Sequence, residues 1–319
     1  MLNVFITIDV EVWCDGWENL DEKFPSAFNR YIYGPTPTGN YGLPYQLSLL
    51  QDHGLQGVFF VEPLFATRFG IEPLAEILGL IKDANQEVQL HLHPEWVDES
   101  NEELLLGKQT KKSFLMNFSA ADQERLIAIS TKLLNQAGGI TTDAFRAGNF
   151  AANRDTMRAL AANGIQFDSS YNASMFGQQS DMLPGELGIE PFLCEGVQEY
   201  PVTVFDDGRA LRHAQLTACS WSEIQALLWR ALDAKRRSFV IFGHTSEILT
   251  RSKTRKDPVV INRFRKLCQF LDTHSEKFRT CGFRGLDVLP SGSQPAPLNS
   301  PLRRTMARML EQVYRRRYS

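Results

Sequence analysis

Short apolar runs alternate with longer amphipathic stretches along most of the chain. The short runs have the length of buried strands, and the longer ones repeat their apolar positions with helical spacing. This alternation is typical of parallel βα units and predicts an α/β fold, either a β/α barrel or an open doubly wound sheet. The expected strands are 2–8, 57–62, 87–93, 143–146, 165–167, 199–204, 238–243 and 281–289. The expected helices are 43–53, 71–83, 119–138, 153–163, 258–274 and one that begins at Ser220 or Ser222 and runs to Lys235.

Three stretches break the alternation and are expected to be long connections. Residues 14–42 are rich in aromatics, glycine and proline, 101–118 are polar, and 177–196 lack a clear period. Near the end, 291–301 are rich in Ser, Pro and Gly, which is typical of a linker. The last residues, 302–319, carry six arginines against one acid. We therefore expect one domain over 1–290 and a linker with a basic tail or helix over 291–319.

Composition narrows the class of protein. The 319 residues are 43% hydrophobic and 22% charged, as in ordinary globular proteins, and a net charge of −3 gives no reason to expect nucleic acid. The five cysteines are scattered without a C-x-x-C pair, so neither a disulfide framework nor a thiolate zinc site is indicated. The sequence opens on a strand pattern and has no apolar run near the roughly 18 residues of a spanning helix. These features predict a cytoplasmic or membrane-surface protein.

Two pairs of polar residues stand at the ends of apolar strands. In the stretch EVQLHLHPEW, His91 and His93 are two residues apart, so in a strand they share a face and can reach one ion. Pro94 then ends the hydrogen-bonded ladder. Asp9 and Glu11 have the same spacing after the first strand. A lone histidine on a strand is more often a hydrogen-bonded core residue, but the two pairs together favour a metal site.

Polar residues end several of the expected strands, and such ends meet at one edge of a parallel sheet. Two imidazoles and one carboxylate leave a coordination position for water, as in catalytic zinc sites. We therefore expect Glu11, His91 and His93 to bind a divalent metal, with zinc as the first choice. Asp9 would act as base, and Arg146 would keep it ionised. His244 would protonate a leaving amine, which is the chemistry of an amide hydrolase. The residues expected in this site are Asp9, Glu11, His91, His93, Arg146, Asp168 and His244.

Five stretches in order, TIDVE, HLHPEW, FRAGN, FDSSY and GHT, resemble the motifs of the polysaccharide deacetylase family, also called NodB-homology or carbohydrate esterase family 4. The segment LLQDHGLQGVFFVEP looks like that family's helix and second strand, so the resemblance spans about Asn3 to Leu289. It implies a distorted or incomplete (β/α)7 barrel and metal-dependent removal of acyl groups from sugars. By motif it also implies that Asp9 is the base, Arg146 its partner, His244 the acid, and Asp168 the residue of the fourth motif.

The sequence departs from the family pattern at the expected metal ligands. The usual D-D becomes Asp9-x-Glu11, and the usual H-x-x-x-H becomes His91-x-His93. The histidines are then presented by a strand rather than by a helical turn. Glu95 is an alternative to Glu11 as the third ligand.

The expected function is removal of an acetyl or formyl group from an amino sugar in surface polysaccharide or glycolipid biosynthesis. The missing export signal resembles family members that act inside the cell on glycan precursors or lipid-linked sugars. The alternatives are an amidohydrolase of a small non-sugar amide and a catalytically silent carbohydrate-binding relative. The basic tail could lie on the inner face of an anionic membrane or remain solvated.

Overall fold

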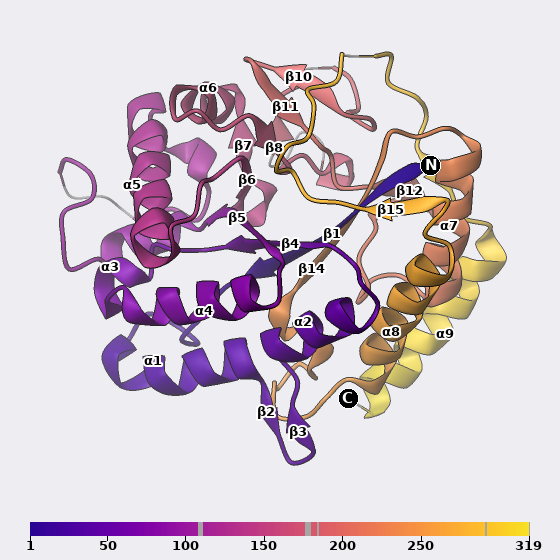
Figure 1. The fold of residues 1–319 in the computed structure, drawn as a ribbon, viewed down its shortest axis with the longest axis horizontal. Coiled ribbons are helices and arrows are strands. Elements are labelled where there is room, and N and C mark those ends of the chain that lie inside the picture. Colours follow the sequence, from indigo (N-terminus) through magenta and orange to yellow (C-terminus); the bar gives the residue numbers. More distant parts are fainter. Residues whose placement is uncertain (108–110, 176–179, 184, 291, 319) are drawn as a thin grey trace. The chain divides into compact units, whose positions relative to one another are not determined.

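The structure is a computed structural model that describes residues 1–107, 111–175, 180–183, 185–290 and 292–318 (Figure 1). The chain divides into two compact units, which are described separately. The first comprises Met1–Gly57, Thr203–Cys281 and Ala296–Ser319. The second comprises Val58–Val202 and Gly282–Pro295.

The first unit is built around strand β1, Leu2–Val10. On one side β1 pairs in parallel with β14, Ser238–His244, and on the other with β15, Phe278–Thr280. β1 and β14 are almost entirely buried, which explains why their sequences are nearly continuous apolar runs and do not alternate between apolar and polar residues. The register places Asp9 beside His244, at the carboxyl ends of both strands.

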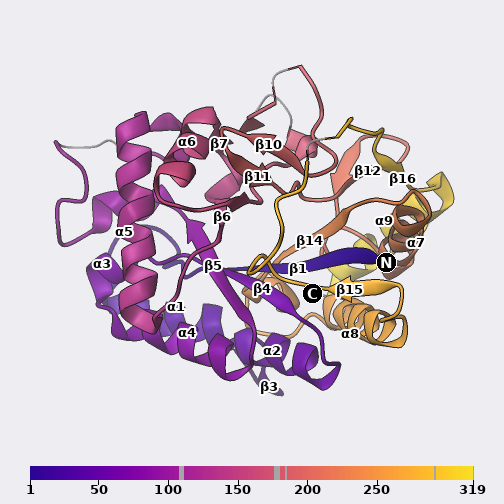
Figure 2. The same ribbon diagram turned by 45° about the horizontal axis from the view of Figure 1, so that its top comes forward.

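Helices and short strands complete this unit, and Figure 2 shows α7 and α8 running side by side. The remaining helices are α1 (Leu20–Phe28), the π-helix η1 (Asn29–Tyr33), α2 (Leu43–Asp52), α7 (Trp221–Asp233), η6 (Thr245–Ile248), α8 (Pro258–Thr273) and α9 (Leu302–Tyr318). The remaining strands are β2 (Pro35–Thr36), β3 (Gly39–Asn40), β12 (Val204–Asp206), β13 (Leu211–His213) and β16 (Leu298–Asn299). β2 pairs with β3, and β12 lies between β13 and β16.

The second unit contains a run of strands in the order β10-β11-β8-β6-β5-β4, parallel except for the pair β10 and β11. Its helix α5 packs against both α4 and α6. The strands are β4 (Gly57–Val61), β5 (Glu87–Leu92), β6 (Ala144–Ala147), β7 (Ala152–Asn153), β8 (Phe167–Asp168), β9 (Ser180–Asp181), β10 (Phe192–Cys194) and β11 (Val197–Glu199). The helices are α3 (Ala66–Phe69), α4 (Glu72–Asp83), η2 (Pro94–Glu99), η3 (Leu115–Asn117), α5 (Ala120–Gly138), η4 (Gly148–Phe150), α6 (Arg154–Ala162) and η5 (Ala173–Met175).

The six expected helices are confirmed to within a few residues, and their ends follow the capping residues. Ser119 accepts a hydrogen bond from the Asp122 amide at the start of α5. Ser220, one of the two candidates, caps α7 through a capping box with Glu223. These side chains satisfy amides that the first helical turn leaves without partners.

Three expectations about connections and strands are wrong. Residues 14–42 are not a loop throughout, because they contain α1, η1 and a short hairpin, and α1 tolerates Pro25 in its interior. The expected strand 199–204 is divided between β11 and β12, with Pro201 between them. A proline has no amide to donate to a ladder, which accounts for the break. The strand expected at 281–289 is not formed, and the strand nearest to it is β15 at 278–280. Of the connection expected at 177–196, residues 177–179 and 184 lie outside the described residues.

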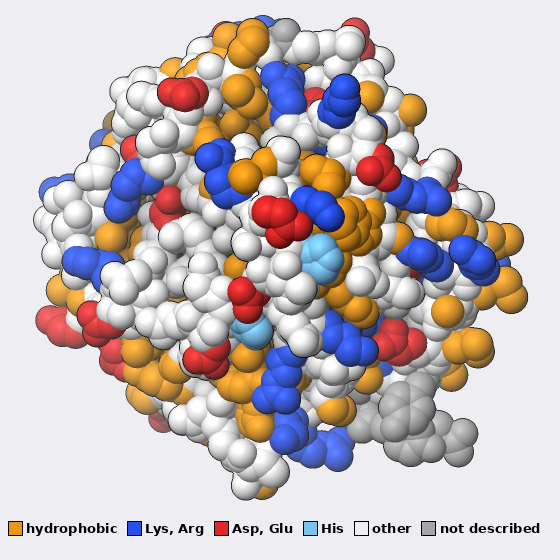
Figure 3. All heavy atoms as spheres, turned by 45° about the vertical axis from the view of Figure 1, so that its right-hand side comes forward, with side chains coloured by type: hydrophobic (Ala, Val, Ile, Leu, Met, Phe, Trp, Pro, Cys, Tyr) orange, Lys and Arg blue, Asp and Glu red, His pale blue; other side chains and the backbone are white. Residues whose placement is uncertain are grey.

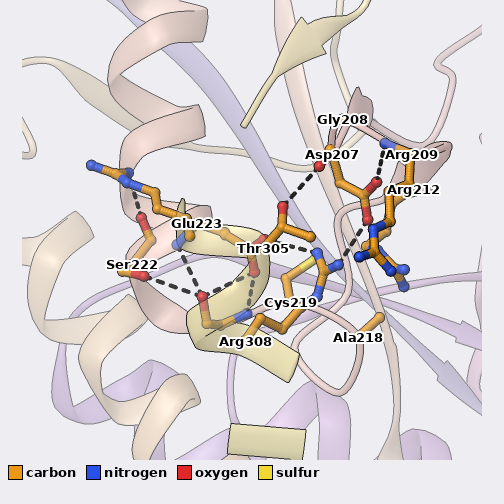
Figure 4. Close-up of polar contacts among 12 residues, drawn as sticks. Asp207, Gly208, Arg209, Arg212, Ala218, Cys219, Ser222, Glu223, Thr305 and Arg308 are labelled. Atoms are coloured by element: carbon orange, nitrogen blue, oxygen red, sulfur yellow. Dashed lines mark hydrogen bonds and ion pairs between the residues drawn. The ribbon is translucent and has the colours of Figure 1, made fainter. Parts of the chain in front are cut away.

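The C-terminal residues form α9, which is held to the first unit by a buried arginine (Figure 4). The guanidinium of Arg308 is 1% exposed and donates to Glu223 Oε1 at 2.8 Å and Asp207 Oδ2 at 2.7 Å. The Thr305 hydroxyl donates to the Asp207 carbonyl at 2.8 Å. Burial alone would raise the pKa of Asp207, but the bonds from Arg308 and Arg212 lower it to about 2.

No helix in the described ranges is both long enough and apolar enough to cross a bilayer.

We predict that Arg308→Ala lowers the free energy of unfolding by about 3–5 kcal/mol. The substitution leaves the buried carboxylates of Glu223 and Asp207 without their main cation. Urea denaturation followed by circular dichroism measures the change. Arg303→Ala is the matched control, since Arg303 is exposed on the same helix and should alter stability by no more than about 0.5 kcal/mol. A loss below about 1 kcal/mol for Arg308→Ala would contradict the anchoring role.

Candidate functional site

In the first unit, three acidic and imidazole side chains gather where β1 and β14 end. Asp9 lies on β1, Glu11 follows it, and His244 ends β14. Each offers one ligand atom, and these atoms all lie within 4.8 Å of one another. Asp9 is 2% exposed, while Glu11 and His244 are partly exposed. The cluster therefore combines a buried carboxylate with groups that solvent can reach.

Neighbouring side chains fix the orientation of Glu11 and His244. The indole of Trp13 donates to Glu11 Oε2 at 2.6 Å. His244 Nδ1 bonds Glu247 Oε1 at 2.7 Å, and its Nε2 is 3.8 Å from Glu11 Oε1. Gln215 donates to the same oxygen of Glu247. The ring of His244 is thus held between two carboxylates.

These carboxylates change the protonation of His244. Burial alone would lower the pKa of its imidazole, but the charges of Glu11, Glu247 and Asp9 outweigh burial and raise that pKa to about 9. An imidazole with this pKa carries its proton at neutral pH, so it can give the proton to a reacting group.

In the second unit, the two histidines predicted from the sequence lie at the end of β5, with His91 on the strand and His93 directly after it. His91 is 2% exposed and His93 5% exposed, and their ring centroids are 4.8 Å apart. His91 Nδ1 bonds the Arg146 carbonyl at 2.8 Å, across the pairing of β5 with β6. His93 Nδ1 bonds Glu95 Oε2 at 3.2 Å. The spacing does place both imidazoles at the carboxyl end of one strand.

The three histidines share one bonding pattern. In each, Nδ1 meets a carbonyl or carboxylate oxygen. In a neutral ring of His91 or His93, Nδ1 then carries the proton and Nε2 the lone pair, whereas protonated His244 carries a proton on both nitrogens. This is how partner oxygens orient histidines that bind metals. The donor set of imidazole nitrogens and carboxylate oxygens therefore suits a divalent ion such as zinc.

Arg146 and Asp168 lie on neighbouring strands of the same unit, and both are fully buried. Arg146 donates from Nε to the Ser169 carbonyl at 2.9 Å, and its guanidinium lies 4.3 Å from the centre of the Phe60 ring. Asp168 accepts from the Ser170 hydroxyl at 2.6 Å and pairs in register with Glu199 of β11. Burial raises the pKa of Asp168, and burial together with the Asp168 carboxylate raises that of Glu199. Asp168 therefore shares its surroundings with a second acid.

The structure places the predicted site residues in two groups, one in each unit. Asp9, Glu11 and His244 come together in one unit. In the other unit, His91, Arg146 and Asp168 lie on adjacent strands, and His93 directly follows the strand of His91. The metal set Glu11, His91 and His93 and the pairing of Arg146 with Asp9 join residues of different units and stay predictions. Glu95, the alternative ligand, bonds the His93 ring.

Sequence reasoning missed three residues that orient the site. Glu247 lies three residues after His244, Trp13 lies two residues after Glu11, and Glu199 is far from Asp168 in sequence. The local spacings could have indicated Glu247 and Trp13. Strand pairing alone reveals Glu199.

Comparisons with solved structures identify the fold. A putative polysaccharide deacetylase from Mycobacterium smegmatis superposes with a TM-score of 0.59 at 17% identity, covering 93% of this chain and 95% of that one. A family 4 carbohydrate esterase from Streptomyces lividans has a TM-score of 0.44, 12% identity and coverage of 91% and 97%. A CE4-family pseudoenzyme from Bacillus anthracis has a TM-score of 0.43, 12% identity and coverage of 87% and 63%. No protein-family model matches the sequence, and neither does any curated protein.

The likeness to the first of these structures confirms the predicted fold class, an α/β fold of the incomplete-barrel, polysaccharide-deacetylase type.

We predict that Gly148→Ala displaces the His93 ring. A Cβ at position 148 would lie 2.6 Å from His93 Cε1 and Nδ1, closer than any real contact of this kind. The expected results are a shift of the His93 imidazole signals in NMR spectra and a loss of about 1–3 kcal/mol of stability. Gly79→Ala, on α4 with open space around it, is the control and should be neutral or slightly stabilising. Unchanged His93 signals in Gly148→Ala would show that the ring is not held as described.

Proposed function

We propose that this protein is a metal-dependent hydrolase that removes an N-acyl group, acetyl or formyl, from an amino sugar. The observation that carries the proposal is the shared pattern of His91, His93 and His244, each with Nδ1 bonded to an oxygen at the end of a strand. The fold shared with a putative polysaccharide deacetylase is consistent with it.

Glu11, His91 and His93 are the proposed ligands of the ion, and zinc is the ion that we propose. When bound, the ion would polarise the acyl carbonyl and make a nearby water more acidic. Neutral imidazoles are required for this role, and the oxygen at each Nδ1 keeps Nε2 as the coordinating atom. Trp13 holds one oxygen of Glu11, which limits the rotation of that carboxylate.

Asp9 is the proposed base, which takes a proton from the attacking water. Its side chain is almost fully buried at the end of β1, and a carboxylate is a group that can accept a proton in such a step. Arg146 would keep Asp9 ionised, and Asp168 would support Arg146 from the neighbouring strand. Asp168 and Glu199 each have a raised pKa, so we propose that Asp168 has a positioning role.

His244 is the proposed acid. It is protonated at neutral pH, because nearby carboxylates raise its pKa to about 9. As the amide C–N bond breaks, the imidazole gives its proton to the leaving nitrogen. The products are the free amine of the sugar and a carboxylic acid. Glu247 keeps the ring in place during this transfer.

We predict that the purified protein holds a divalent ion. His91→Ala and His93→Ala should each lower its metal content at least tenfold, because a ligand is lost. Asp9→Asn should keep the ion but lose turnover, since the base is gone. Mass-spectrometric metal analysis and assays of released acetate or formate measure the two effects.

His53→Ala is the control, because this histidine bonds Asp272 at the surface and should leave both properties unchanged. A stoichiometric ion in the variant that lacks both His91 and His93 would overturn the ligand assignment. Assays with N-acylated sugars and with small non-sugar amides separate the proposal from its main alternative. A silent relative would turn over neither.

We also propose that α9 rests on an anionic membrane surface, with the protein on the cytoplasmic side. Four apolar side chains on one face of this helix are exposed, namely Leu302 (53%), Met306 (58%), Leu310 (73%) and Val313 (65%). Arg303 borders them, and Figure 3 shows hydrophobic and basic side chains next to one another on the side where α9 lies.

The structure revises which tail arginines could reach lipid. Arg304, Arg308 and Arg315 bond Ser222, Glu223 and Asp257 within the first unit, so they are not available for headgroups. The side chains of Tyr314, Arg316 and Arg317 lie outside the described residues. The proposed contact therefore depends on the apolar face more than on charge.

We predict that the protein floats with vesicles containing anionic phospholipid, and that Leu310→Glu with Val313→Glu abolishes this. The two new carboxylates would face the membrane and be repelled by it. Leu106→Glu is the control, since Leu106 is 83% exposed in the other unit and should not alter flotation. Equal recovery of the wild type with and without vesicles would reject the contact.

A further inference from the structure

The first unit contains a pocket that the proposed chemistry does not use. Its volume is about 320 Å³, within the range of small-molecule sites. The β2–β3 hairpin lines one part and the segment after β14 lines the other. The lining residues are Thr36, Pro37, Thr38, Thr250, Arg255, Lys256 and Pro258. Three hydroxyls and two cationic side chains thus meet in one cavity.

Internal hydrogen bonds order both walls of this pocket. On the hairpin, the Thr36 hydroxyl donates to the Gly39 carbonyl at 2.7 Å. On the other wall, the Thr250 amide donates to the Arg255 carbonyl at 2.8 Å, and Leu249 pairs with Lys256. Lys256 links the two walls, because its Nζ donates to the Tyr41 hydroxyl at 3.1 Å. The cavity is therefore preformed rather than assembled from mobile chain.

The charge around the pocket is positive. The loop 249–256 carries Arg251, Lys253, Arg255 and Lys256 and no acid. The first acid after it, Asp257, is fully buried, caps α8 and bonds Arg315, so its charge is compensated inside the fold. In the described part of the chain no carboxylate pairs with Arg255. An exposed guanidinium beside hydroxyls, with no acid to satisfy it, is a feature of anion sites.

We propose that this pocket binds a phosphate group of the substrate. A phosphate offers several acceptor oxygens, which matches a planar arginine fork and a neighbouring ammonium better than a carboxylate does. The inference rests on the proposed function in one respect, the identity of the sugar that carries the phosphate. The substrate class would then be a phosphorylated or diphosphate-linked N-acyl amino sugar.

Isothermal titration calorimetry on the full-length protein tests this pocket. The probes are inorganic phosphate, N-acetylglucosamine 1-phosphate and N-acetylglucosamine. The phosphorylated sugar should bind at least tenfold more tightly than the plain sugar, and Arg255→Ala should remove about tenfold of that affinity, as expected for one charge-assisted bond. Thr38→Val should weaken binding by a smaller factor, because it removes one hydroxyl and keeps the shape.

Arg251→Ala is the matched control. Arg251 is exposed on the same loop but does not line the pocket, so affinity should stay within about twofold. Equal affinity for the phosphorylated and plain sugars, or wild-type phosphate binding by Arg255→Ala, would overturn the inference.

The same titrations in Asp9→Asn separate this inference from the proposed function. Binding without turnover in that variant supports the pocket and the base together. Inorganic phosphate binding that depends on Arg255, with no hydrolysis of any sugar by the wild type, would keep the pocket and reject the deacylase. The source of the phosphate is then tested with two further ligands, a nucleoside diphosphate sugar and a polyprenyl diphosphate sugar in detergent micelles. The ligand that loses more affinity in Arg255→Ala, relative to the wild type, carries the phosphate that the pocket binds.

Discussion

The parallel pairing of β1 with β14 is the constraint on which the proposed chemistry depends. It joins residues more than two hundred positions apart and fixes Asp9 directly beside His244. Because the side chains of a strand alternate between faces, a shift of one residue would turn both groups away from each other. The long buried apolar runs on both strands hold the register, since any slip would expose apolar surface or bury polar groups. The relative placement of Asp9 and His244 is thus a consequence of core packing.

Hydrogen bonds and charges around the histidine rings determine which roles these rings can take in the proposed chemistry. Oxygens at Nδ1 set the tautomers of His91 and His93, and the carboxylates around His244 raise its pKa. Glu247 both orients the ring of His244 and helps to raise its pKa, and Gln215 donates a hydrogen bond to Glu247. His91 and His93 are oriented in the same way, as suits coordinating groups. The acid and ligand roles that we propose therefore rest on what surrounds each ring and not only on where it stands in the sequence.

Much of the fold could be predicted from the sequence because its signals are local. Strand-length apolar runs, capping residues such as Ser119, and the spacing of His91 and His93 each act within a few residues. Long-range partners could not be predicted in that way. Glu199 reaches Asp168 only through the pairing of β8 with β11, and no single-sequence pattern reports that pairing.

The C-terminal segment shows the same limit. Its arginines look like a solvated basic run, yet Arg308 is among the most buried side chains because two acids from distant segments surround it. The sequence did not predict helix α1, for a related reason. Pro25 and a flank rich in aromatics and glycine suggest a loop, whereas Leu20, Phe24 and Ala27 share a buried face at helical spacing. Tertiary burial outweighs local propensity in both places.

Removal and return of the metal test the proposed reaction most directly. The protein is stripped with a chelator, and acetate or formate release from N-acylated amino sugars is measured before and after addition of zinc. We expect release to stop in the stripped protein and to return with about one equivalent of the ion. Release by the stripped protein at the original rate would contradict a metal-dependent deacylase.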